Sequence, residues 1–112
     1  MIWHKHLEHR FPDLPAYQQI IMVTNELNRA NSQKDNHIEY KACLERALEL
    51  LDFIIDDSTK WGKKYKELLR ARQFLAQRYI ESHVYTDTSL LQRTIHQLDP
   101  EATKLLMHQK SP

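Results

Sequence analysis

Three residues near the end of a long helical segment have side chains suited to cleaving an RNA phosphodiester without a metal ion. They are Arg78, His83 and Tyr85, in the order Arg, four residues, His, one residue, Tyr. A histidine with a pKa near neutrality can take the proton of a 2′-hydroxyl. An arginine can hold the phosphate while negative charge develops on it. We therefore treat these three residues as the candidate catalytic group.

The segment from Arg78 to Ile95 resembles the signature of HEPN-domain ribonucleases, in particular the toxins paired with a small nucleotidyltransferase. In that family the motif closes a long helix, and a helix with the pattern Asp-x-x-Leu-Leu-x-x-Ile follows. The chain has all four residues of that pattern: Asp87, Leu90, Leu91 and Ile95. Two positions differ, because Tyr79 replaces a residue that is usually polar and Ser82 replaces one that is usually valine-like. The resemblance implies a metal-independent endoribonuclease that acts as a dimer.

The same motif has a simpler structural interpretation. On a continuous helix Arg78 and His83 would point about 140° apart, at about 100° per residue. They converge only if the helix ends near Glu81 or Ser82, or if each meets the copy on a second chain. Otherwise His83 is a capping or core histidine, while Arg78 and Tyr85 face solvent.

A second candidate site is a basic stretch that follows an acidic one. The segment 35–57 contains seven acidic and two basic residues, whereas 60–78 contains seven basic residues and one acidic residue. Pairing between the two segments, together with solvation, is the simpler interpretation. The alternative is that the basic residues bind nucleic-acid phosphates beside Trp61 and Tyr65. The candidate nucleic-acid-binding residues are Lys60, Lys63, Lys64, Lys66 and Arg70.

Arg72 falls among the apolar residues of this segment, between Leu68 and Leu75. A buried guanidinium needs a partner, so we expect an acid from another helix or an aromatic face against it.

The histidines give little support for a metal site. His4, His6 and His9 lie close together in a polar N-terminal arm, residues 1–13, which we expect to be solvated. The bundle helices lack the Glu-x-x-His pairs of a di-iron bundle, so no metal site is predicted. We expect His37, His96 and His108 to be surface or cap residues.

The elements that would position these residues are all helical. One glycine, four prolines and few β-branched residues disfavour a sheet. Apolar periodicity and cap residues, such as Asn36 with Glu39 three residues later, predict helices over 14–30 and 36–56, from Ser58 or Thr59 to Tyr85, and over 87–98, with a kink or a fifth helix after Asp99-Pro100-Glu101. Gly62 is the weak point of the third helix, and Lys63 is the alternative start. The third helix places one apolar stripe inward: Trp61, Tyr65, Leu68, Leu69, Leu75, Ala76, Tyr79 and Ile80. The predicted fold is an antiparallel four- to five-helix bundle, a single all-α domain over 14–110.

Composition limits the functions that are compatible with this fold. The chain has 112 residues and a net charge of +1, which disfavours binding of polyanions through bulk charge. Cys43 is the only cysteine, so no internal disulfide can form. No stretch is apolar enough to cross a membrane, and we expect a soluble cytoplasmic protein.

The leading hypothesis is a binding module, either a homodimer or a protein with another protein partner, without a small-molecule cofactor. RNA is the alternative partner.

Overall fold

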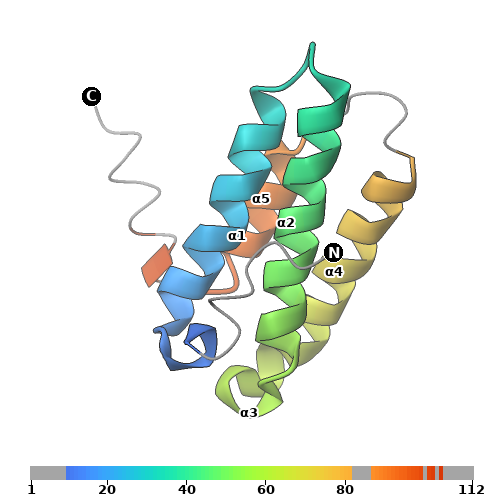
Figure 1. Cartoon of the computed structure of the whole chain (residues 1–112). Helices are drawn as coiled ribbons and strands as arrows, with labels where there is room; N and C mark the ends of the chain where they lie inside the picture. Colours follow the sequence, from blue (N-terminus) through green and yellow to red (C-terminus); the bar gives the residue numbers. More distant parts are fainter. Residues whose placement is uncertain (1–9, 82–86, 100, 103, 105–112) are drawn as a thin grey trace.

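A computed structural model describes residues 10–81, 87–99, 101–102 and 104. In these ranges the secondary structure is helical, without a strand. The elements are η2 (Phe11–Asp13), α1 (Ala16–Asn31), α2 (His37–Ile55), α3 (Ser58–Trp61), η3 (Gly62–Lys64), α4 (Tyr65–Ile80) and α5 (Ser89–His96). Figure 1 shows α1 and α2 lying side by side, with α4 next to α2.

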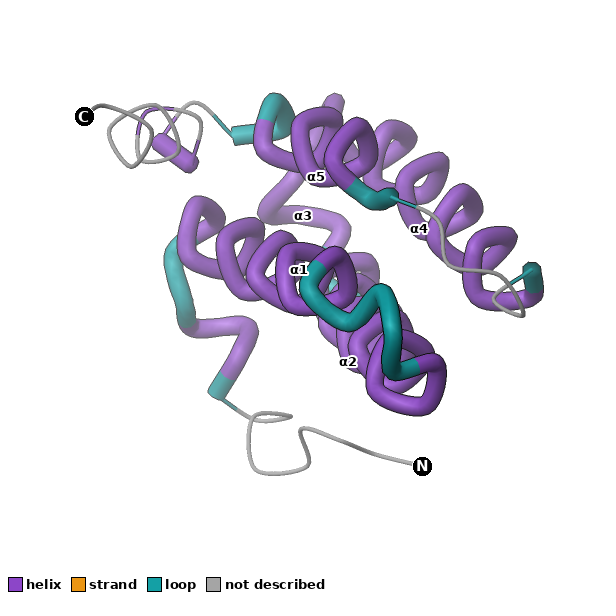
Figure 2. The backbone as a smooth tube through the Cα atoms, turned by 90° about the horizontal axis from the view of Figure 1, so that it is seen from above, coloured by secondary structure: helices purple, strands orange, loops and turns teal. Residues whose placement is uncertain are grey.

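The four longer helices pack in a ring. α1 packs on α2, α2 on α4, α4 on α5, and α5 on α1 (Figure 2). The count of four is the lower end of the expected range, and most residues after Asp99 lie outside the described part of the chain. None of the described helices is long and apolar enough to span a membrane.

The segment before α1 folds against the bundle. The Phe11 side chain is fully buried, and its ring centroid lies 5.7 Å from that of Phe53 on α2. The Gln19 amide Nε2 donates to the Phe11 carbonyl at 2.7 Å. The expectation that everything up to residue 13 forms a polar arm is therefore wrong for Phe11.

α2 begins at the cap that the sequence predicts and lies centrally. The Asn36 side chain accepts a hydrogen bond from the Glu39 backbone N–H at 3.1 Å. This satisfies one of the donors that a helix start leaves unpaired. Leu50 is buried although it lies off the main apolar stripe, because α2 is covered by both α1 and α4.

The predicted third helix begins at Ser58, and it is broken at the glycine predicted to be its weak point, Gly62. Gly62 has a φ of +51°, in the left-handed region, and η3 separates α3 from α4. This conformation favours glycine, because a Cβ there approaches the following carbonyl. The break turns Trp61 into the core while Lys63 remains exposed.

The buried face of α4 differs from the predicted stripe. Leu68, Ala71 and Leu75 are buried, because α4 contacts α2 on one side and α5 on the other. Leu69 and Ile80 lie outside this face and are 41% and 74% exposed, so their predicted inward orientation is wrong.

α5 is attached to the end of α1 by a polar contact. Thr88 is fully buried, and its hydroxyl donates to the Leu27 carbonyl at 2.8 Å. Asn31 Oδ1 accepts from the Thr88 backbone N–H at 2.7 Å. His96 is also buried, with Nδ1 3.2 Å from the Ala102 carbonyl oxygen, so the expected surface position of His96 is wrong.

Candidate functional site

A groove runs between α4 and α5 on the outside of the bundle. It has a volume of about 320 Å³ and is lined by Phe74, Arg78, Leu90, Leu91 and Thr94. The Phe74 side chain is 66% exposed and that of Leu90 is 70% exposed. Two large apolar side chains thus flank an open, mostly apolar groove.

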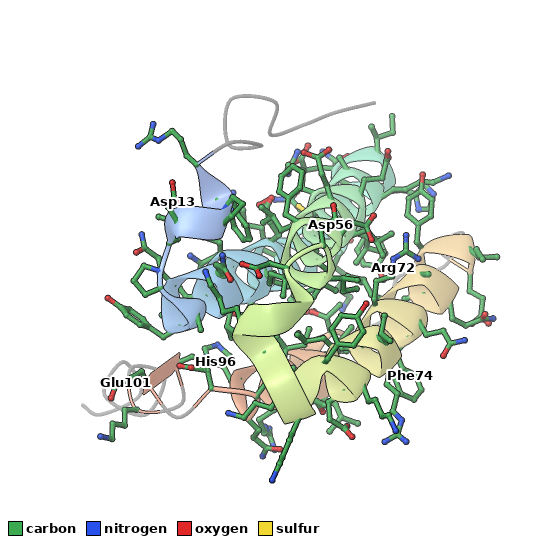
Figure 3. The ribbon with its side chains drawn as sticks, turned by 90° about the horizontal axis from the view of Figure 1, so that it is seen from below. Asp13, Asp56, Arg72, Phe74, His96 and Glu101 are labelled. Atoms are coloured by element: carbon green, nitrogen blue, oxygen red, sulfur yellow. The ribbon has the colours of Figure 1, made fainter. Side chains whose placement is uncertain are left out.

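A second hollow shares Phe74 with the groove. It has a volume of about 340 Å³ and is lined by Arg70, Gln73, Phe74 and Gln77. Phe74 lies between the two hollows on the outer side of α4 (Figure 3). Its position follows from the register of the helix, because Ala71 and Leu75 occupy the inward face. Phe74 was not among the functional residues predicted from the sequence, although it lines both hollows.

Basic side chains predominate on the two helices that form the groove. α4 and α5 together contain five arginine and lysine residues and one acidic residue, a net charge of +4. Arg70 forms a 2.9 Å ion pair with Glu67, and both side chains are largely exposed. The residues lining the groove and the neighbouring hollow are mostly uncharged, and their two charged members, Arg70 and Arg78, are both basic.

Arg78 lies where α4 ends, beside the groove. α4 ends at Ile80, and the Glu81 backbone N–H bonds to the Gln77 carbonyl at 3.0 Å. This meets the condition set above for Arg78 and His83 to converge. His83 and Tyr85 themselves lie outside the described residues.

From the last turn of α4, the Arg78 side chain contacts the segment that leads into α5. Its Nη1 donates to the Asp87 backbone carbonyl at 3.1 Å. Hydrogen bonds from the Ser89 side chain and backbone lower the pKa of the Asp87 carboxyl. Asp87 therefore places a negative charge just before α5. The hydrogen bond from Arg78 links the end of α4 to the segment that begins α5.

The structure does not bring the five candidate nucleic-acid-binding residues together. Lys60 Nζ donates to the carbonyls of Pro12 and Leu14 at 2.6 and 2.8 Å, so this residue joins α3 to the N-terminal segment. The other four lie on η3 and the first half of α4: Lys63, Lys64, Lys66 and Arg70. Trp61, proposed to stack beside them, is buried.

Arg72 finds the acidic partner that the sequence predicts. Its Nε and Nη2 donate to the two carboxylate oxygens of Asp52 on α2, at 2.8 and 3.3 Å. These hydrogen bonds raise the pKa of Arg72. The side chains are 40% and 50% exposed, so the predicted burial of the guanidinium is wrong.

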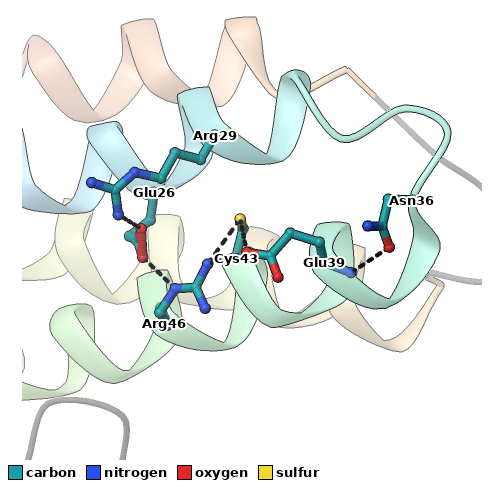
Figure 4. A network of polar contacts seen from close by, with 6 residues as sticks. All are labelled: Glu26, Arg29, Asn36, Glu39, Cys43 and Arg46. Atoms are coloured by element: carbon teal, nitrogen blue, oxygen red, sulfur yellow. Dashed lines mark hydrogen bonds and ion pairs between the residues drawn. The ribbon is translucent and has the colours of Figure 1, made fainter.

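A buried polar network joins α1 to α2 on another side of the bundle (Figure 4). Glu26 is only 3% exposed and accepts hydrogen bonds from Arg29 at 2.5 Å and from Arg46 at 2.7 Å. Arg46 also donates to Glu39 at 2.7 Å and to the Cys43 sulfur at 3.2 Å. This network was not predicted from the sequence.

The network is suited to holding two helices together. Burial lowers the pKa of Arg46, but hydrogen bonds to Glu39 and Glu26 outweigh it, and the pKa is raised overall. Burial raises the pKa of the Cys43 thiol. Because the thiolate is the reactive form, Cys43 is poorly suited to nucleophilic chemistry at neutral pH.

Among the described residues no group of three or more histidine, cysteine or acidic side chains could hold a metal ion. His4, His6 and His9 lie outside those residues.

Comparisons with known proteins found no matching family model, no matching curated protein and no matching solved structure.

Proposed function

We propose that this protein is a binding module that receives a partner protein in the groove between α4 and α5. The observation that carries the proposal is the exposure of Phe74 and Leu90 at this groove. Apolar side chains gathered beside a concave surface are typical of protein-binding sites, and aromatic residues often supply most of the binding energy. The described residues that line the groove carry two groups suited to chemistry, the Arg78 guanidinium and the Thr94 hydroxyl, and neither is a general base.

A displayed library of random peptides tests the proposal. Peptides are selected on the wild-type protein and then measured on a Phe74→Ser variant, which removes the aromatic ring from an exposed position. Ile80→Ser is the matched control, because Ile80 is an equally exposed apolar residue of α4 outside the groove lining. We expect selected peptides to lose at least about tenfold in affinity on Phe74→Ser, about 1.4 kcal/mol, and to keep it on Ile80→Ser. Equal binding to all three proteins would refute the proposed site.

The second candidate function is the metal-independent endoribonuclease that uses Arg78, His83 and Tyr85. It is supported by the end of α4 at Ile80, which allows the chain after Arg78 to turn back. Such an enzyme would act as a dimer, with RNA as its substrate.

Purified protein and a His83→Ala variant, each incubated with total RNA in EDTA, test this second function. We expect a ribonuclease to cleave RNA in the wild type and to lose cleavage in the variant. Cleavage that is absent from both, or equal in both, would end the hypothesis.

A further inference from the structure

We infer that the partner in the α4–α5 groove is an acidic segment with at least one apolar anchor residue, and that Arg70 and Arg78 select it. This inference rests on the proposed function and specifies the chemistry of the partner.

Arg70 and Arg78 lie on either side of Phe74 on one face of α4. They are four residues before it and four residues after it, and side chains at this spacing are neighbours on a helix. Arg70 lines the hollow on one side of Phe74, and Arg78 lines the groove on the other. An apolar side chain packed on Phe74 would therefore have a guanidinium on each side of it.

Both guanidinium groups have donors left for a partner. The contact between Arg78 and the Asp87 carbonyl uses one of five N–H groups. The ion pair between Arg70 and Glu67 is exposed, and exposed pairs contribute little to stability. A carboxylate from a partner could displace Glu67 or bind beside it at little cost.

The charge disfavours a second copy of this chain as the occupant. The charged residues lining the two hollows, among those described, are Arg70 and Arg78, so two copies of this face would bring arginines against arginines and repel each other across an interface. An acidic segment is attracted by the same charge, which also speeds its association.

The lining disfavours RNA as the occupant. Single-stranded nucleic acids are held by several aromatic side chains on which successive bases stack. Among the described residues, Phe74 is the sole aromatic residue that lines either hollow, and Trp61 is buried. A partner with aliphatic or aromatic anchors and surrounding carboxylates matches this surface better.

The experiment uses two labelled peptides of about 12 residues, each with leucines at helical spacing. One carries glutamate at the remaining positions and the other carries lysine. Their affinities are measured by fluorescence polarisation on the wild type, Phe74→Ser, Arg78→Glu and Lys34→Glu. Lys34→Glu makes the same change in net charge in the exposed loop between α1 and α2. A short labelled oligouridine is measured in parallel.

We expect the wild type to bind the acidic peptide at least about tenfold more tightly than the basic one, with binding that depends on Phe74. Arg78→Glu should remove or reverse this preference, and Lys34→Glu should leave it intact. If both peptides bind equally and Phe74 is required, the groove stands as a site and the acidic preference is overturned. If neither peptide binds and the library also yields no Phe74-dependent peptide, the proposed function itself fails. Oligouridine binding that is tighter than acidic-peptide binding and requires Phe74 would overturn the inference in favour of RNA.

Discussion

Glu26 is the residue whose surroundings are hardest to predict from the sequence. Acidic side chains are rarely buried unless they are paired, and in α1 Glu26 is adjacent to the clearly apolar Leu27. Its partner Arg46 is 20 residues away on another helix, a distance at which no local pattern links the two. Arg72 and Asp52 are also 20 residues apart. A partner for Arg72 could nevertheless be predicted, because Arg72 is a charged residue among apolar residues of the same helix. A charged residue within an apolar stripe indicates that it needs a partner. An acidic residue beside such a stripe does not, because it has the spacing of a solvent-exposed residue.

Replacing Glu26 by glutamine should destabilise the protein by about 2 kcal/mol. Glutamine has nearly the same shape but no charge to offer the two arginines, and hydrogen bonds to charged groups contribute about 1.5 to 3 kcal/mol. Urea unfolding of the wild type and the variant measures this difference. Glu67→Gln is the control, since it breaks the exposed pair with Arg70 and should change the free energy of unfolding by less than about 1 kcal/mol. Equal small effects would show that the buried network contributes no more than a surface pair.

Glu39 should make part of the protein's stability dependent on pH. A hydrogen bond from Arg46 lowers the pKa of Glu39 below its ordinary value of 4.5. A carboxyl group with a lowered pKa in the folded state contributes stability above its unfolded pKa, and this contribution is lost as the pH falls through the folded pKa. The wild type should therefore lose more stability than Glu39→Gln when the pH is lowered from 6 to about 3. Parallel pH profiles of unfolding for the two proteins would contradict this expectation.

At the scale of single elements, helix starts and breaks were predicted better than buried faces. The Asn36 cap and the weakness at Gly62 depend on one residue and its own backbone, so they can be recognised in the sequence. The inward face of α4 depends on where α2 and α5 lie, and the expected positions of Leu69 and Ile80 were wrong for that reason. Apolar spacing alone does not indicate which of two adjacent stripes is covered.

Gly62 allows a precise test of the break between α3 and α4. Gly62→Ala should destabilise the protein by about 1 to 2 kcal/mol, the cost of a left-handed conformation for a residue with a Cβ. Apart from the adjoining residues of the chain, no atom lies within 4 Å of a Cβ built at this position, so the loss would come from the local backbone alone. Gly62→Asn should cost less, because asparagine tolerates this conformation better. Chemical denaturation of the three proteins gives the comparison, and an alanine variant as stable as the wild type would show that the backbone adjusts at no cost.

For the molecule as a whole, composition and periodicity were sufficient to predict an all-helical fold in which four helices pack together. The ring order was not predictable, because it depends on contacts between distant segments such as α1 and α5. The groove was missed for the same reason. Leu90 has the spacing of a core residue, and the residues that line the groove come from two helices whose relative placement the sequence does not reveal. A surface formed by two elements becomes visible only after they are packed.

The attachment of α5 predicts that this helix opens before the rest of the bundle. α5 is short, and its first turn is held to α1 by the Thr88 hydroxyl, which donates to the Leu27 carbonyl. Thr88→Val removes this hydrogen bond from a buried site, at a cost of about 0.5 to 1.5 kcal/mol. If α5 opens locally, amide hydrogen exchange should accelerate by up to about tenfold in α5 and little in α1 and α2.

Thr94→Val is the matched control for this prediction, because the Thr94 hydroxyl is exposed and bonds only within α5, to the Leu90 carbonyl at 2.9 Å. Its effect on exchange should be small in every helix. Uniform acceleration across all four helices in Thr88→Val would instead show that the bundle opens as one unit.

Local opening of α5 would also open the α4–α5 groove, since α5 supplies Leu90, Leu91 and Thr94. The Thr88 variant should therefore bind a groove-dependent peptide more weakly even though Thr88 does not line the groove.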